Sequence, residues 1–131
     1  MYNCESKTLS RFIHRLMANY LSRGYFYYVI GKIPPHKDPA KTDRKIITQY
    51  GIAASKWAKA RARKRGEASI QYHRYAENFV ILATEGTHRF FTEEAFGLRD
   101  IRLEPLVVAG CVISYQWRTE GTHFFVRRAK H

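Results

Sequence analysis

The densest group of chemically active side chains is a run of cations between Ser55 and Gly66. Six lysines and arginines fall within ten residues, and no acid interrupts them: Lys56, Lys59, Arg61, Arg63, Lys64 and Arg65. Cations placed along a phosphodiester backbone release its counterions, and arginine also forms paired hydrogen bonds with phosphates and guanine edges. Helix faces that merely stay in water usually interleave glutamate with their cations. The run therefore predicts a contact with a polyanion.

Trp57 lies inside this cationic run. A helix that starts after Ser55 places Lys56, Lys59 and Arg63 on one face, because their spacings are three and four residues. We favour a tryptophan that packs inward and anchors the helix. Stacking of the indole on a nucleobase is the alternative.

The surplus of positive charge is confined to the first half of the chain. The 131 residues carry 23 Lys and Arg against 11 Asp and Glu, a formal net charge of +12. Residues 1–66 hold 15 cations and 3 acids, whereas residues 67–131 hold 8 of each. Such asymmetry indicates a localised binding face. The cations expected to extend this face beyond the run are Lys32, Lys37, Lys41, Arg44 and Lys45.

The sequence Thr-Glu-Gly-Thr-His occurs twice, at 84–88 and 119–123, each time before paired aromatics. We interpret both copies as Glu-Gly turns that join a strand to an aromatic segment. In the alternative the two loops meet, and their imidazoles and carboxylates form an acid–base, phosphate or metal cluster. The residues of that cluster would be His88, His123, Glu85 and Glu120.

The usual motifs of nucleotide and metal chemistry do not occur. The chain lacks a GxxxxGK[ST] loop, a GxGxxG fingerprint, a GxSxG elbow, and CxxC, HExxH and His-x-His pairs. We therefore predict no cofactor and no metal site. A small nickase or nuclease remains an alternative. It would use a tyrosine as nucleophile and His73 as a further acid–base candidate, and only in that case would a divalent metal be expected. Otherwise His73 is expected on the surface of a strand.

Periodicity predicts helices in the first half. Leu9, Ile13, Leu16 and Tyr20 form one stripe of a helix over 5–22, which a strand over 25–33 follows. Asp38 and Pro39 predict a helix start, and Gly51 an interruption. Ser55 predicts the cap of a second helix, which runs to Arg65 and closes at Gly66.

Strand patterns dominate the second half. Residues 69–75 and 79–84 predict a β-hairpin with a tight turn at 76–78. A short helix over 91–97, capped by Thr92, precedes a weak strand over 98–104. Residues 106–117 predict one strand with a kink or bulge at Gly110, and 122–128 a last strand.

These elements predict a single α+β domain over residues 1–131, with a basic, mostly helical half (1–66) and a charge-balanced, mostly strand half (67–131). We expect an antiparallel or mixed sheet with long basic helices packed on one face, and an N-terminal helix. The β-α-β-β order of the core resembles ferredoxin-like plaits, and C-terminal strands follow it.

We therefore expect a cytoplasmic nucleic-acid-binding protein that contacts DNA or RNA backbones through the basic helix. The apolar run 106–113 is too short to cross a membrane, and the N-terminus lacks a signal-peptide core. The two cysteines predict one exposed and one buried free thiol, which fits a reducing compartment. A basic protein-interaction subunit of a larger assembly is a further alternative, and an exposed edge at 106–113 would permit a homodimer.

Overall fold

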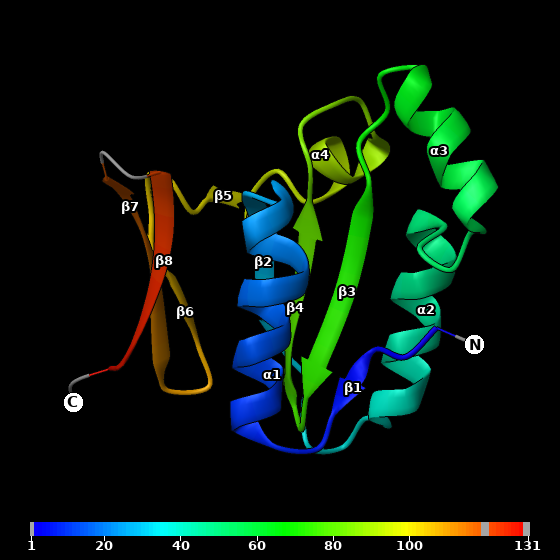
Figure 1. Cartoon of the computed structure of the whole chain (residues 1–131). Coiled ribbons are helices and arrows are strands. Elements are labelled where there is room, and N and C mark those ends of the chain that lie inside the picture. Colours follow the sequence, from blue (N-terminus) through cyan, green and yellow to red (C-terminus); the bar gives the residue numbers. More distant parts are fainter. Residues whose placement is uncertain (1, 119–120, 130–131) are drawn as a thin grey trace.

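A mixed five-stranded sheet forms the centre of the molecule (Figure 1). The computed structural model describes residues 2–118 and 121–129, without the side chains of residues 117, 118 and 121–123. Its strand order is β1-β3-β4-β2-β5, with β1 parallel to β3 and all other neighbours antiparallel. The bounds are Glu5–Ser6 for β1, Tyr27–Lys32 for β2, Ile70–Tyr75 for β3, Asn78–Ala83 for β4 and Arg99–Asp100 for β5. The α+β class and the mixed sheet are thereby confirmed.

The predicted hairpin of β3 and β4 is confirmed, with Tyr75 opposite Asn78 at its closed end. Ala76 adopts a φ of 51° in the turn, a left-handed conformation that tight hairpin turns require. Because side chains alternate along a strand, Tyr72 and His73 of β3 lie on opposite faces of the sheet. Both are buried, so both faces of β3 are covered.

Helix α2 (Pro39–Tyr50) begins and ends where the sequence predicts. The Asp38 carboxylate accepts a hydrogen bond from the Ala40 amide at 3.1 Å, and Gly51 ends the helix with a φ of 63°. Ile46 and Tyr50 are buried against the sheet face that carries Tyr72. The cap and the apolar stripe together fix this helix on the sheet.

The first helical segment is shorter than predicted and changes its winding. Helix α1 covers Leu9–Arg15, a π-helical turn follows over Leu16–Tyr20, and a 3₁₀ turn over Leu21–Arg23. Thr8 caps α1, because its side-chain oxygen accepts a hydrogen bond from the Arg11 amide at 3.2 Å. The residues before Thr8 therefore form β1 and not the start of the helix.

The predicted helix at 91–97 and strand at 98–104 are both displaced or shortened. Helix α4 covers Arg89–Glu93, and its cap is His88 and not Thr92, since the imidazole accepts a hydrogen bond from the Phe90 amide. Only Arg99 and Asp100 of the predicted strand pair, with β2, as the edge strand β5.

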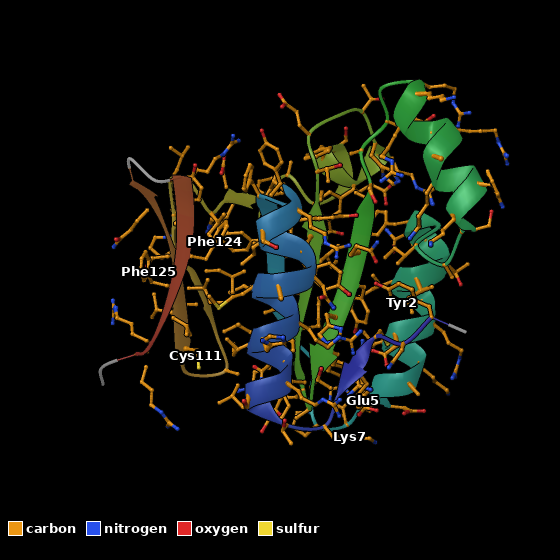
Figure 2. All side chains as sticks on the ribbon, in the orientation of Figure 1. Tyr2, Glu5, Lys7, Cys111, Phe124 and Phe125 are labelled. Carbon is orange, nitrogen blue, oxygen red and sulfur yellow. The ribbon has the colours of Figure 1, made fainter. Side chains whose placement is uncertain are left out.

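The C-terminal part forms a second, antiparallel sheet of β6 (Leu106–Val108), β7 (Cys111–Arg118) and β8 (Gly121–Arg128). The single kinked strand predicted over 106–117 is wrong. Ala109 and Gly110 have φ angles of 50° and 76°, and two left-handed residues reverse the chain into a hairpin. Cys111 and Phe124 lie on the side facing α1, whereas Phe125 lies on the outer side (Figure 2).

The core is divided between the two faces of the five-stranded sheet. One cluster joins α1, the sheet and β6–β8, and the other joins the sheet to α2 and α4. The two predicted basic helices do not pack alike: α2 contributes Ile46 and Tyr50 to the core, but α3 (Lys56–Lys64) has no buried residue. Both cysteines are free and buried, so an exposed thiol at one of them was a wrong prediction. Within the described residues, no helix combines the length and the apolar character needed to cross a membrane.

Candidate nucleic-acid interface

Helix α3 carries the cationic run and stands apart from the core (Figure 1). Its cap is Ser55, whose hydroxyl oxygen accepts a hydrogen bond from the Ala58 amide at 3.1 Å. Gly66, with a φ of 82°, ends it as predicted. The half-buried Ala58 and Ala62, one helical turn apart, line a small hollow of about 180 Å³ together with core residues. These small side chains leave the cationic side of the helix in solvent.

Trp57 lies on the exposed side of α3 and not in the core. Its side chain is 77% exposed, so the predicted inward anchor is wrong. The physical reason is that alanines form the inner side of the helix, and residue 57 lies about 100° away from residue 58. At spacings of four and seven residues, Arg61 and Lys64 share the side of the helix on which Trp57 lies. The indole is therefore an exposed aromatic surface flanked by cations.

The six cations of the run divide into three groups. Lys59 is half-buried, with its Nζ atom 5.9 Å from the centre of the Tyr2 ring. Burial, and secondly the charge of Arg63, lower the pKa of the Lys59 ammonium. Arg65 pairs with Glu67 at 2.6 Å. The remaining four are exposed and form no ion pair among the described residues: Lys56, Arg61, Arg63 and Lys64.

The predicted common face of Lys56, Lys59 and Arg63 is therefore divided, because the Lys59 ammonium lies over the Tyr2 ring. Figure 2 shows Tyr2 on the same side of the molecule as α2, from which α3 continues. An ammonium above a tyrosine ring is stabilised where it lies. Lys59 is thus held toward the protein, while the other lysine and arginine side chains extend into solvent.

The cations predicted to extend the surface are all exposed, and most of them surround a groove between β2 and α2. This groove has a volume of about 740 Å³ and an apolar floor. Four of the five predicted residues line it: Lys32, Lys37, Lys41 and Lys45. The fifth, Arg44, is exposed on α2 outside the groove.

His73 is a core residue and not the strand surface residue that the sequence predicts. It is fully buried, stacks on Phe12 with ring centres 5.6 Å apart, and shares a 2.7 Å hydrogen bond with the Ser6 hydroxyl. Burial, with a smaller effect of the Arg15 cation, lowers its pKa to about 4. Its Nδ1 atom is buried and has no hydrogen-bond partner in the part of the chain that the structure describes. A neutral, enclosed imidazole cannot exchange protons with a substrate.

His88 acts at the start of α4. Its Nδ1 atom accepts a hydrogen bond from the Phe90 amide at 3.1 Å, and its ring meets the Tyr50 ring edge-on. Burial lowers the pKa of His88, which keeps Nδ1 free to accept this bond. Glu85, from the same loop, is exposed and lines a separate hollow next to Arg23 and Arg63.

The proposed cluster of the two Thr-Glu-Gly-Thr-His loops is only partly covered by the structure. Glu120 and the side chain of His123 lie outside the described residues. Within the described residues, no group of three or more His, Cys, Asp or Glu side chains could hold a metal ion.

The tyrosines give little support to a nucleophilic role. Burial is the main cause that raises the pKa of Tyr2, Tyr28, Tyr50 and Tyr72, and it raises that of Tyr28 to about 12. A raised pKa leaves the hydroxyl protonated and weakly nucleophilic. The aromatic residues of β2 and β3 also do not form an open platform for bases, because helices cover both faces of the sheet.

Two features were missed by sequence reasoning. The first is the exposure of Trp57, which the three alanines of α3 could have indicated, since Trp57 is the one large apolar residue of the helix and forms no apolar stripe with others. The second is the contribution of Phe79 to the floor of the groove, where this residue of β4 lies directly opposite Gly31 of β2. A glycine inside a strand pattern is a sign of such a close approach.

No protein-family model matches the chain, and neither curated proteins nor solved structures gave a match.

Proposed function

We propose that this protein binds nucleic acid, DNA or RNA, through the exposed side of α3. The observation that carries the proposal is the side chain of Trp57, 77% exposed on a helix that has no buried residue. An exposed indole flanked by cations offers a flat surface on which a nucleobase can stack. Because cations surround the indole, the partner that matches this surface best is a polyanion that also carries flat rings.

The charge pattern supports the same partner. Lys56, Arg61, Arg63 and Lys64 form no ion pair among the described residues, whereas the buried Arg74 pairs with Asp43 and with Glu5. Unpaired exposed cations gain free energy from phosphates through counterion release. The indole adds base stacking, which is tolerant of sequence. The lysines of the β2–α2 groove and Arg44 are assigned to the same polyanion as additional contacts.

The strand order supports a finer description of the fold. Within β1-β3-β4-β2-β5, the unit β2-α2-α3-β3-β4 places β4 between β2 and β3, and β4 is antiparallel to both. Strand β5 flanks β2 on the other side. This is the order expected of a ferredoxin-like plait with an added edge strand. We propose this relationship on topology alone, and the proposed binding surface lies on its connection between β2 and β3.

The proposed function is tested by reversing three exposed charges of α3, in the variant R61E/R63E/K64E. Binding to fluorescein-labelled 20-mers of single- and double-stranded DNA and RNA is measured by anisotropy at several salt concentrations. We expect an affinity loss of at least about tenfold, and a salt slope reduced by about one for each lost phosphate contact. The far-UV circular dichroism spectrum should not change, because the three side chains are exposed.

The matched control is R11E/R127E/R128E, which changes the charge equally at exposed positions on α1 and β8, away from α3 (Figure 1). If the control loses as much affinity as the α3 variant, net charge and not α3 governs binding. If the unaltered protein binds none of the four nucleic acids, the proposal fails. In that case, a protein that copurifies with this chain and stays bound after nuclease treatment would favour the interaction-subunit alternative.

A further inference from the structure

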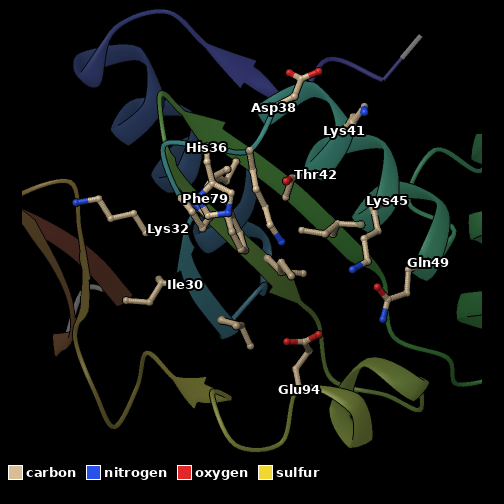
Figure 3. A pocket seen from close by; sticks show the side chains of 16 residues that line it. Ile30, Lys32, His36, Asp38, Lys41, Thr42, Lys45, Gln49, Phe79 and Glu94 are labelled. Carbon is tan, nitrogen blue, oxygen red and sulfur yellow. The ribbon is translucent and has the colours of Figure 1, made fainter.

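The groove between β2 and α2 has two unlike parts, an apolar floor and a cationic rim (Figure 3). Its floor is formed by Val29, Phe79 and Ile81, and its volume is about 740 Å³. It shares no lining residue with α3. A ligand of this groove would therefore bind to residues other than those of the proposed α3 surface.

Phe79 makes the floor flat and aromatic. A Cβ atom added to Gly31, its cross-strand neighbour, would lie 2.2 Å from the tip of the Phe79 ring. The ring therefore occupies the space that any other residue at position 31 would fill. Phe79 is only half-buried, so part of it stays open to the groove. This open part of the ring is available for contact with a flat, aromatic ligand.

The rim of the groove carries unpaired positive charge. Lys37, Lys41 and Lys45 are exposed, line the groove, and form no ion pair among the described residues. Figure 3 shows Lys41 and Lys45 on the α2 side of Phe79, while Lys32 extends away on the opposite side. His36 also lines the rim.

The two acids of the groove have partners of their own. The Asp38 carboxylate accepts a hydrogen bond from the Ala40 amide at 3.1 Å. The Glu94 carboxylate accepts one from the Tyr50 hydroxyl. Neither acid pairs with a groove lysine, so the rim remains available to an external anion.

We propose that this groove binds a nucleoside phosphate, with the base on Phe79 and the phosphates among Lys37, Lys41 and Lys45. The combination of a ring surface with adjacent unpaired ammonium groups matches a ligand that joins an aromatic base to a polyanion. Two sources supply this chemistry: a free nucleotide, or an unpaired nucleotide of a nucleic-acid strand.

The test uses ATP labelled with N-methylanthraniloyl and its fluorescence on binding to the full chain. The variant K41Q/K45Q should weaken binding at least about tenfold, because two charge-assisted contacts are lost. The matched control R61Q/R63Q alters α3 alone and should leave labelled-ATP binding unchanged. Conversely, K41Q/K45Q should weaken duplex DNA binding less than R61Q/R63Q does, because the groove lysines are only additional contacts to the polyanion. This opposite ranking of the two variants for labelled ATP and for duplex DNA separates the two proposals.

Competitors identify the part of the ligand that is recognised. Unlabelled ATP should displace the probe at lower concentration than pyrophosphate, and F79L should reduce that difference while pyrophosphate binding persists. Thermal unfolding of F79L shows whether the variant is folded, and K41Q/K45Q provides the test if it is not. A single-stranded ten-nucleotide DNA that competes better than ATP identifies a strand as the source, and the reverse identifies a free nucleotide.

Three results would overturn the assignment. The first is no binding of labelled ATP at millimolar concentration, and the second is binding that K41Q/K45Q does not change. The third is displacement by pyrophosphate as effective as that by ATP, because the floor would then contribute nothing.

Discussion

Arginine and lysine occupy two opposite environments in this protein. On β3, Arg74 is 7% exposed and its guanidinium donates hydrogen bonds to both carboxylate oxygens of Asp43 on α2, at 2.8 and 2.9 Å. The Tyr72 hydroxyl donates a further bond to Asp43 at 2.6 Å. On α3, Arg61 and Arg63 are exposed and form no ion pair among the described residues.

The difference separates the charges that hold the fold from the charges that remain for a partner. A buried guanidinium requires its carboxylate, since an unpaired buried charge costs several kcal/mol. Removal of an exposed cation changes the stability of the fold little, because water already solvates its charge. Function on α3 and stability at the Asp43–Arg74 pair should therefore respond to substitution independently.

The largest expected effect is on the buried pair. Asp43→Asn removes the closest negative charge and leaves the buried Arg74 with the Glu5 carboxylate alone, 3.4 Å away, so the free energy of unfolding should fall by about 3–5 kcal/mol. Urea denaturation followed by circular dichroism measures this loss. Arg63→Gln on α3 is the control and should change stability by no more than about 0.5 kcal/mol. Equal losses in the two variants would remove the distinction between the two environments.

The next effect concerns pH and His73. The ordinary histidine pKa is 6.5, and burial lowers that of His73 to about 4 in the folded protein. Between these values the unfolded chain binds a proton that the folded protein excludes, so stability is full above pH 6.5 and falls as the pH decreases toward 4. The total loss is on the order of 3 kcal/mol. It is measured by urea denaturation at pH 7, 6 and 5.

His73→Gln provides the comparison, because glutamine does not titrate. The variant should be less stable at pH 7, but its stability should decrease less steeply below pH 6.5. The pKa of His88 is also lowered, so a smaller slope of the same sign should remain. An unchanged slope in the variant would show that other groups govern the acid sensitivity.

Trp57 should affect binding without affecting the fold. Trp57→Ala should lower the affinity for single-stranded nucleic acid about tenfold to a hundredfold, since one stacked base contributes about 1–3 kcal/mol. The urea midpoint should stay nearly constant, because the indole is exposed. Trp57→Phe retains a ring and should recover part of the loss; no difference between the two variants would argue against stacking. A Trp117→Phe background leaves Trp57 as the single tryptophan, whose fluorescence nucleic acid should quench.

The smallest effect compares the caps of two helices. Asp38 caps α2 and Ser55 caps α3, each with a 3.1 Å hydrogen bond to a backbone amide. Substitution of either cap by alanine removes about 1 kcal/mol from its helix. Asp38→Ala should lower global stability because α2 packs into the core. Ser55→Ala should instead increase amide exchange within α3 alone, and a drop in the global urea midpoint equal to that of Asp38→Ala would contradict this.

Local signals predicted the elements that depend on local chemistry. The caps Asp38 and Ser55, and the left-handed glycines at 51 and 66, fix the bounds of α2 and α3 closely. Alternation along residues 69–75, the turn at 76–78 and the apolar run 79–84 together predicted the β3–β4 hairpin. The cationic run was placed correctly on a helix for the same reason.

Features that depend on distant contacts escaped prediction. The burial of His73 requires α1 to cover one face of β3, and the exposure of Trp57 requires α3 to lie outside the core. The residues next to His73 and Trp57 in the sequence determine neither condition. The two-residue strand β1 is likewise defined by its partner, and the turn at Ala109 required a left-handed conformation that alanine rarely adopts.

The parallel pairing of β1 with β3 also affects the order in which the protein folds. Ser6 and His73, joined by a hydrogen bond, are 67 residues apart in the chain. Closure of so large a loop is entropically costly, whereas the β3–β4 hairpin closes through a turn of a few residues. The two residues of β1 should therefore be among the last to reach their place, after the strand β3 that receives them has formed.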